Sequence, residues 1–245
     1  MSDINSTIRT LLTQQTQQTV RVAASQARSN TSPKIAETSS AAKRLENKAR
    51  ISEVHATNGH LAQARESVAS AALDNASDIV GRLGEIATRA TDGQLNSSDR
   101  AALQQEAETL QGELSDIFSN TKFNGQQLFS GNSINAATEN SVEIQDPDGS
   151  NITGALGTLD LSSPSSSNAA LEQVKDAQSE LNNARTQVGV SSSSVGRATL
   201  QDYRAAAELS GLADQVSAEH ALQKIQELHK FETQEKIHAL LSKGD

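Results

Sequence analysis

The scarcity of aromatic side chains is the feature that most constrains what this chain can fold into. Its 245 residues include four Phe, one Tyr and no Trp. A large globular core usually relies on aromatic side chains, each of which buries roughly 150–250 Å². Hydrophobic residues make up only 35% of the chain, and three Pro leave long helices uninterrupted. The composition therefore argues against one large globular core and favours an elongated helical protein.

A seven-residue repeat in the second half of the chain predicts long helix packing. Val174, Leu181, Val188 and Val195 recur at this spacing, and small residues, mostly Ala, occupy a second register between them. Branched aliphatic side chains at one seam position and small side chains at the other suit closely packed helices. Apolar residues also recur every three or four residues from Leu61 to Ala90. We therefore expect a mainly α fold, an elongated antiparallel helical rod or coiled coil.

The helical period disappears between about residues 120 and 168. Asp146-Pro147-Asp148-Gly149 is a turn signal, because proline pre-sets one φ and glycine tolerates a positive φ. The residues on either side alternate between apolar and polar types, as strands do. This pattern predicts a short β-hairpin at about 141–153, followed by a loop at 162–167 and a helix from about 168.

Breaks in the helical pattern suggest how the chain is divided. Pro33 interrupts the first amphipathic stripe, since proline disfavours helix at the residue before it. We expect an N-terminal helix with a connecting segment over 1–40, a helical rod domain over 41–202 and a C-terminal helix over 203–245.

The sequence identifies no segment of the chain that would cover the apolar stripes of the two terminal segments. A lone amphipathic helix buries nothing, so these stripes must pack on each other or on neighbouring molecules. We predict a subunit interface that includes Ile4, Ile8, Leu11, Leu209, Leu212, Val216, Leu222, Ile225, Leu228, Ile237 and Leu240.

Several functional classes are disfavoured. A net charge of −9 without a basic block argues against nucleic-acid binding. No apolar stretch is long enough for a membrane span, and the first residues lack the features of a secretory signal. The chain has no Cys, and His220, His229 and His238 are too far apart to share a metal on one helix. We find no catalytic motif, and therefore predict no enzymatic activity and no cofactor.

Three motifs in the middle of the chain resemble bacterial flagellin. They are Arg82–Gly93, with an R-x-x-E-I-A pattern; Ser98-Asp99-Arg100; and Thr121–Gly125, with a T-x-F-N-G pattern. The resemblance extends over the whole chain but is specific only over 82–125. The short segment between the two helical halves implies a divergent flagellin without large outer domains.

The resemblance implies a structural subunit that polymerises into the flagellar filament used for motility, with the terminal helices pairing in the polymer. It also implies an extracellular location, export without a cleavable signal peptide, and contacts with itself, other flagellins, an export chaperone and cap or junction proteins. Flagellins that an innate Toll-like receptor detects contact it through three residues, matched here by Arg82, Ile86 and Glu106. Two alternatives stay open: a flagellin-like hook–filament junction protein, and a secreted coiled-coil binding module.

Overall fold

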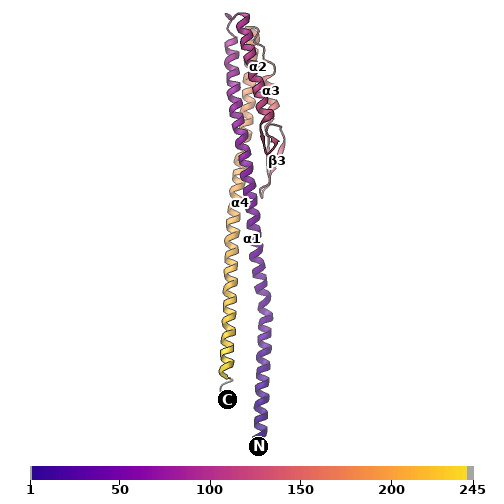
Figure 1. The fold of residues 1–245 in the computed structure, drawn as a ribbon, viewed down its shortest axis with the longest axis vertical. Helices are drawn as coiled ribbons and strands as arrows, with labels where there is room; N and C mark the ends of the chain where they lie inside the picture. The colour runs from indigo at the N-terminus through magenta and orange to yellow at the C-terminus, as the bar shows by residue number, and fades with distance from the viewer. Residues whose placement is uncertain (1, 242–245) are drawn as a thin grey trace. The chain divides into compact units, whose positions relative to one another are not determined.

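The computed structural model describes the backbone of residues 2–241 and the side chains of Gln14, Gln18 and residues 37–237. Its helices are α1 (Ser2–Ala90), α2 (Ser97–Asn120), α3 (Gly149–Leu156) and α4 (Pro164–Leu241). Its strands are β1 (Lys122–Phe123), β2 (Gln126–Gln127), β3 (Ser133–Ala136) and β4 (Val142–Gln145). The strands form two antiparallel pairs, β1 with β2 and β3 with β4 (Figure 1). The predicted mainly α fold with a short hairpin is confirmed.

The chain forms two compact units. One contains residues 52–204, and the other combines residues 1–51 with residues 205–245. The sequence suggested domain boundaries after residues 40 and 202, whereas these units divide after residues 51 and 204. The three-domain assignment itself stays a prediction.

Within residues 52–204, α1 and α4 pack side by side in opposite directions. A Cβ atom at Gly59 would clash with the side chain of Thr199, and one at Gly84 would lie 3.5 Å from Cγ1 of Val174. Residue numbers thus rise along one helix as they fall along the other, which is the antiparallel arrangement that the repeats predicted. The absence of a side chain at Gly59 lets the Thr199 side chain pack directly against the backbone of α1.

The main core of this unit lies where α1, α2, α3 and α4 meet. It consists largely of Leu, Ile, Val and Ala, as the composition requires. Its aromatic contribution includes Phe118 and Phe129, whose ring centroids lie 5.1 Å apart in an edge-to-face arrangement. The largest side chains that are almost fully buried are Leu73, Val80, Leu83, Leu110, Leu114, Leu128, Ile144, Ile152, Leu156, Leu159, Leu161 and Leu181.

Side chains of α2 connect it to the end of α1. Asn96 caps α2, because its side-chain oxygen accepts hydrogen bonds from the backbone N–H groups of Ser98 and Asp99. The buried guanidinium of Arg100 donates to the carbonyl oxygens of Ala90 at 2.7 Å and Asp92 at 2.6 Å. These carbonyl groups lie at and just beyond the end of α1, where they have no hydrogen-bond donor within the helix. Arg100 therefore fixes the turn between the two helices.

The predicted helix breaks are absent. α1 continues through Pro33, and α4 continues through residue 203. A proline removes one hydrogen bond and costs about 3 kcal/mol, which a long helix tolerates locally. At the other position, Asp202 and Ala206 are both buried, so the packed face of α4 extends across the expected break.

The predicted hairpin at 141–153 is wrong in its second half. Val142–Gln145 is a strand, but it pairs with Ser133–Ala136, and the following residues form α3. The reason is that Asp148 accepts a hydrogen bond from the Ser150 backbone N–H and so starts a helix. Ile152 and Leu156, four residues apart, then bury one face of that helix.

The predicted loop at 162–167 is too long, because residues 162 and 163 lie outside any helix but α4 begins at Pro164. Proline suits the first position of a helix, where its missing N–H would be unpaired in any case. The Ser163 hydroxyl accepts a hydrogen bond from the Ser166 backbone N–H and serves as the cap.

Candidate functional site

The end of α4 presents large aliphatic side chains to solvent. Leu222, Ile225, Leu228 and Ile237 are each more than half exposed. Of the other residues predicted at a subunit interface, Leu212 is 41% exposed, and Leu209 and Val216 are half-buried. The side chains of Ile4, Ile8, Leu11 and Leu240 lie outside the described residues.

The described side chains of the unit that combines residues 1–51 and 205–245 bury very little apolar surface. Among its described residues, the buried apolar side chains are Ala49, Ala206 and Ala213. Each contributes one methyl group, whereas a fully buried Leu or Ile contributes roughly 1.5–3 kcal/mol. The exposed aliphatic side chains described for this unit are therefore available to other molecules.

A second exposed stripe lies on α1, where the sequence predicted one continuous buried face from Leu61 to Ala90. The face is buried from Ala72 onward, but Leu61 is 51% exposed and Val68 is 38% exposed. Between residues 62 and 69 the inward positions are occupied by Ala62, Arg65, Glu66 and Ala69. The buried register is thus displaced from the predicted one, and the larger aliphatic residues lie outside. We call the exposed set Val54, Thr57, Leu61, Ala64, Val68 and Ala71 the outer seam.

Two of the three residues proposed by resemblance for receptor contact come together on the surface. The Arg82 guanidinium lies 3.8 Å from the Glu106 carboxylate, and both side chains are about half exposed. Ile86, in contrast, is only 4% exposed and belongs to the core. Its burial leaves it unable to present its side chain to a receptor in this fold. A receptor contact through Arg82 and Glu106 stays a prediction.

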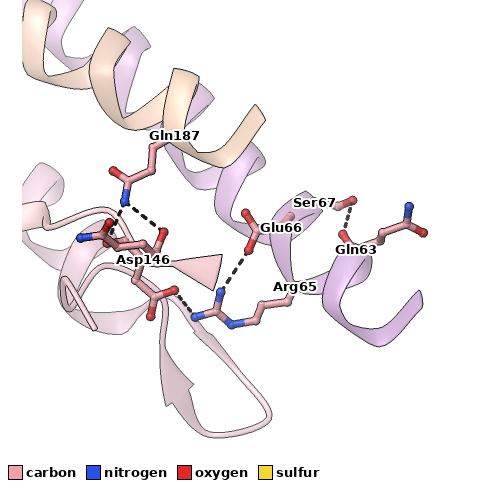
Figure 2. Close-up of polar contacts among 7 residues, drawn as sticks. Gln63, Arg65, Glu66, Ser67, Asp146 and Gln187 are labelled. Carbon is pink, nitrogen blue, oxygen red and sulfur yellow. Dashed lines mark hydrogen bonds and ion pairs between the residues drawn. The ribbon is translucent and has the colours of Figure 1, made fainter. Parts of the chain in front are cut away.

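A buried charged cluster joins α1 to the strand β4 region. Arg65 forms ion pairs with Glu66, at 3.1 Å, and with Asp146, which immediately follows β4 (Figure 2). The side chains of all three residues are at most 5% exposed. A buried guanidinium without an acidic partner would be strongly destabilising, so the two carboxylates are needed where they are. The cluster fixes the hairpin end against α1.

Polar contacts from both long helices hold the β3–β4 hairpin in place. Asn58 of α1 donates to the Ala137 carbonyl oxygen at 3.1 Å. Gln187 of α4 donates to the Gln145 carbonyl oxygen at 3.1 Å (Figure 2). The apolar contribution is small, since the local core consists of Ala62, Ala136, Ile144 and Val195. The hairpin is therefore positioned largely by directional hydrogen bonds.

The acidity of the Glu66 carboxyl is perturbed by its surroundings. Burial raises its pKa above the ordinary value of 4.5, while the charge and hydrogen bond of Arg65 oppose the increase. Asp146 adds a smaller repulsive contribution in the same direction as burial. Folding thus favours the protonated form of this carboxyl.

Sequence reasoning missed the charged cluster. One sequence feature could have indicated it. Arg65 and Glu66 lie on the same helix face as Ala62 and Ala69, which are buried. Charged residues at such positions are almost never buried unless they are paired. The partner Asp146 lies 81 residues away and could not be identified without the fold.

The described part of the chain contains neither a metal-binding cluster nor a membrane-spanning helix. Among those residues, no group of three or more His, Cys, Asp or Glu side chains is arranged to hold a metal ion. No described helix has an apolar stretch long and continuous enough to cross a membrane. The exposed apolar stripes suit association with another protein surface, whereas the ionic cluster lies inside the subunit.

Comparison with known proteins gives a consistent answer. Residues 14–134 match the family model for the bacterial flagellin N-terminal helical region. The flagellin FljN of Caulobacter vibrioides is 32% identical over 99 residues, which amount to 40% of this chain and 34% of FljN. The match therefore spans about a third of that relative's length.

Solved structures share the fold. The crystal structure of Bacillus cereus flagellin matches with a TM-score of 0.54 and 21% identity, covering 60% of this chain and 88% of that one. A protein from Vibrio parahaemolyticus, assigned as flagellar hook-associated, matches with a TM-score of 0.59 and 16% identity, covering 73% and 95%. Together with the family match, these findings show that the chain is similar to bacterial flagellins over residues 14–134 and shares the fold of flagellar proteins.

Proposed function

We propose that this chain is a structural subunit that polymerises into the bacterial flagellar filament, outside the cell. The observation that carries the proposal is the exposed aliphatic stripe of α4, with Leu222, Ile225 and Leu228 each more than half exposed. Uncovered aliphatic side chains repeated along a helix favour association with neighbouring helices. The flagellin family is structural, which agrees with this function and with the absence of catalytic motifs in the sequence.

The contact between subunits has to be heterologous. If one surface of a subunit binds a different surface of the next, and the rotation does not close, the product is an open helical polymer. The principal partner is therefore a second copy of this chain. Other flagellins, an export chaperone, and cap or junction proteins are further proposed partners.

A second candidate function is that of a hook–filament junction protein. The likeness to the Vibrio parahaemolyticus hook-associated protein covers more of this chain than the likeness to Bacillus cereus flagellin. A junction protein would occupy only a short zone of the flagellum, whereas a filament subunit would be repeated along its whole length.

The number of copies in sheared flagella separates the two functions. We expect thousands of copies per filament, measured by quantitative mass spectrometry against a labelled standard, and filaments from the purified chain in electron micrographs. A number corresponding to one ring per flagellum would favour the junction protein. If the purified chain forms no polymer under conditions in which another flagellin does, the filament function is wrong.

A further inference from the structure

Two side chains of the long helices each carry a buried polar atom that has no hydrogen-bond partner among the described residues. They are Nδ1 of His55, on α1, and Oδ1 of Asp202, on α4. Asp202 is fully buried and His55 is half-buried, and both belong to the unit of residues 52–204. A buried polar atom that stays unpaired costs free energy, so each such atom in a folded protein requires an explanation.

The two side chains come from the same level of the two helices. Gly59 packs against Thr199, and α1 and α4 run in opposite directions. His55 precedes Gly59 by four residues and Asp202 follows Thr199 by three, so both lie one turn from that contact and toward the same end. At a rise of about 1.5 Å per residue, their levels along the helix axes differ by about 1.5 Å.

His55 faces the junction between α4 and the turn of the β3–β4 hairpin. Around α1, its position falls between those of Asn58 and Gly59, since residues three and four apart lie on one helix face. Asn58 donates to the Ala137 carbonyl oxygen of the turn at 3.1 Å, and Gly59 packs against α4. The His55 side chain is therefore directed between the two elements that these neighbours contact.

Asp202 reaches the same turn from α4. Its Oδ2 accepts a hydrogen bond from the Glu139 backbone N–H at 3.4 Å, and the preceding residue, Gln201, accepts one from Asn140 at 3.2 Å. A separation of 3.4 Å is longer than the usual N–H···O distance, so the contact of Asp202 is weak. This carboxyl group is thus buried with one weak hydrogen bond, whereas a buried charge normally requires a partner.

The charged neighbours of His55 on the facing elements are acidic. They are Asp202 on α4 and Glu139 in the turn. The other charged side chains within four residues on the two helices, Glu53 and Arg204, are exposed. A neutral imidazole donates from only one of its nitrogens, whereas a protonated imidazole donates from both. Protonation therefore places a donor on Nδ1 and adds the attraction of opposite charges.

We infer that His55 and Asp202 form a proton-dependent latch at the hairpin turn. When the imidazole is protonated, its Nδ1–H donates to Oδ1 of Asp202, and the two unpaired atoms satisfy each other. The latch then ties α1 to the carboxylate that holds the turn against α4. When the imidazole loses its proton, the ion pair is lost and the turn is held by neutral hydrogen bonds. This latch operates within one subunit and does not depend on polymerisation.

Hydrogen exchange of the β3 and β4 backbone amides in the unpolymerised full chain measures the latch. Protection factors are compared at about pH 5 and pH 8, on either side of the range in which histidine ordinarily titrates. Every protein in this comparison carries Glu66→Gln, because the nearby Glu66 carboxyl also loses stabilisation as the pH rises. Protection should be about tenfold higher at the lower pH, which is the usual effect of a hydrogen bond between charged groups.

Substitutions of the two partners should remove this difference. His55→Gln and Asp202→Asn should each give equal protection at the two pH values, and the double variant should lose no more than either single variant. His60→Gln is the matched control. His60 is an exposed histidine of the same helix that contacts Gln63 and Tyr203, and its replacement should leave the pH dependence unchanged.

A measurement on the wild-type chain decides the matter if a variant fails to fold. At about pH 5, nitrogen-resolved NMR should show a proton on Nδ1 of His55 that exchanges slowly with water, because it is buried and hydrogen-bonded. The inference is overturned if that proton is missing or exchanges as fast as the one on His60. It is also overturned if protection does not change with pH, or if His60→Gln removes the change as fully as His55→Gln.

Discussion

At the scale of single residues, the ionic contact between Arg65 and its two acidic partners is the most demanding feature of the fold. Removing water from three charged groups is costly, and their attraction offsets that cost only with good geometry. The raised pKa of Glu66 indicates that the attraction of Arg65 does not fully offset the cost of burying the Glu66 carboxylate. The cluster therefore contributes to the position of the hairpin more than to net stability.

Replacing Glu66 with Gln tests this view through the pH dependence of stability. A carboxyl whose pKa is raised by folding contributes stability that is fully present below its unfolded pKa and is lost as the pH rises through its folded pKa. Gln cannot ionise and does not undergo this loss. The free energy of unfolding of Glu66→Gln, relative to wild type, should therefore increase as the pH rises from about 4 to 7.

Urea denaturation at both pH values measures the difference. Glu85→Gln removes an exposed carboxylate from the same helix and should stay within about 0.5 kcal/mol of wild type at either pH. A relative stability of Glu66→Gln that falls as the pH rises would contradict the assignment.

At the scale of elements, the sequence predicted the long helices well and the middle segment poorly. The residues of the seven-residue repeat from Val174 to Val195 form a buried helix face. The prediction succeeded because an apolar repeat of seven residues fits a packed helix and not a strand. The segment Asp146–Gly149 satisfied the rules for a hairpin turn and for a helix start equally. Which one forms depends on whether Ile152 and Leu156 can be buried, and that depends on tertiary packing.

The cap of α3 can be tested by substitution of Asp148. Its carboxylate accepts hydrogen bonds from the backbone N–H of Ser150 at 2.9 Å and from the Ser150 hydroxyl at 2.6 Å. Asp148→Ala should lower the free energy of unfolding by about 0.5–2 kcal/mol, the usual range for a lost helix cap. Asp148→Asn keeps an acceptor oxygen and should retain most of the stability. Equal melting temperatures for all three proteins would show that the cap contributes nothing.

At the scale of the whole molecule, the sequence predicted a subunit interface at the chain ends but not which partner surface covers it, and that interface stays a prediction. Leu222, Ile225 and Leu228 were predicted at an interface because their stripe has no counterpart in the chain, and all three are exposed. The exposed outer seam was not predicted, because Leu61 and Val68 obey the same period as the buried residues that follow them. Choosing between two apolar faces of one helix requires knowing where the hairpin docks.

Polymerisation should depend on the terminal stripe, and this can be separated from folding. Deleting residues 222–245 removes exposed aliphatic side chains while leaving the core of residues 52–204 unchanged. The truncated chain should therefore remain folded and soluble by circular dichroism and form no filaments in electron micrographs. Ile225→Glu should weaken polymerisation less completely, because it leaves an unpaired carboxylate in a dry contact. Glu227→Gln, at a neighbouring position, changes a charge without adding one to the stripe and should polymerise normally. Filaments of normal yield from the truncated chain would mean that assembly relies on other surfaces.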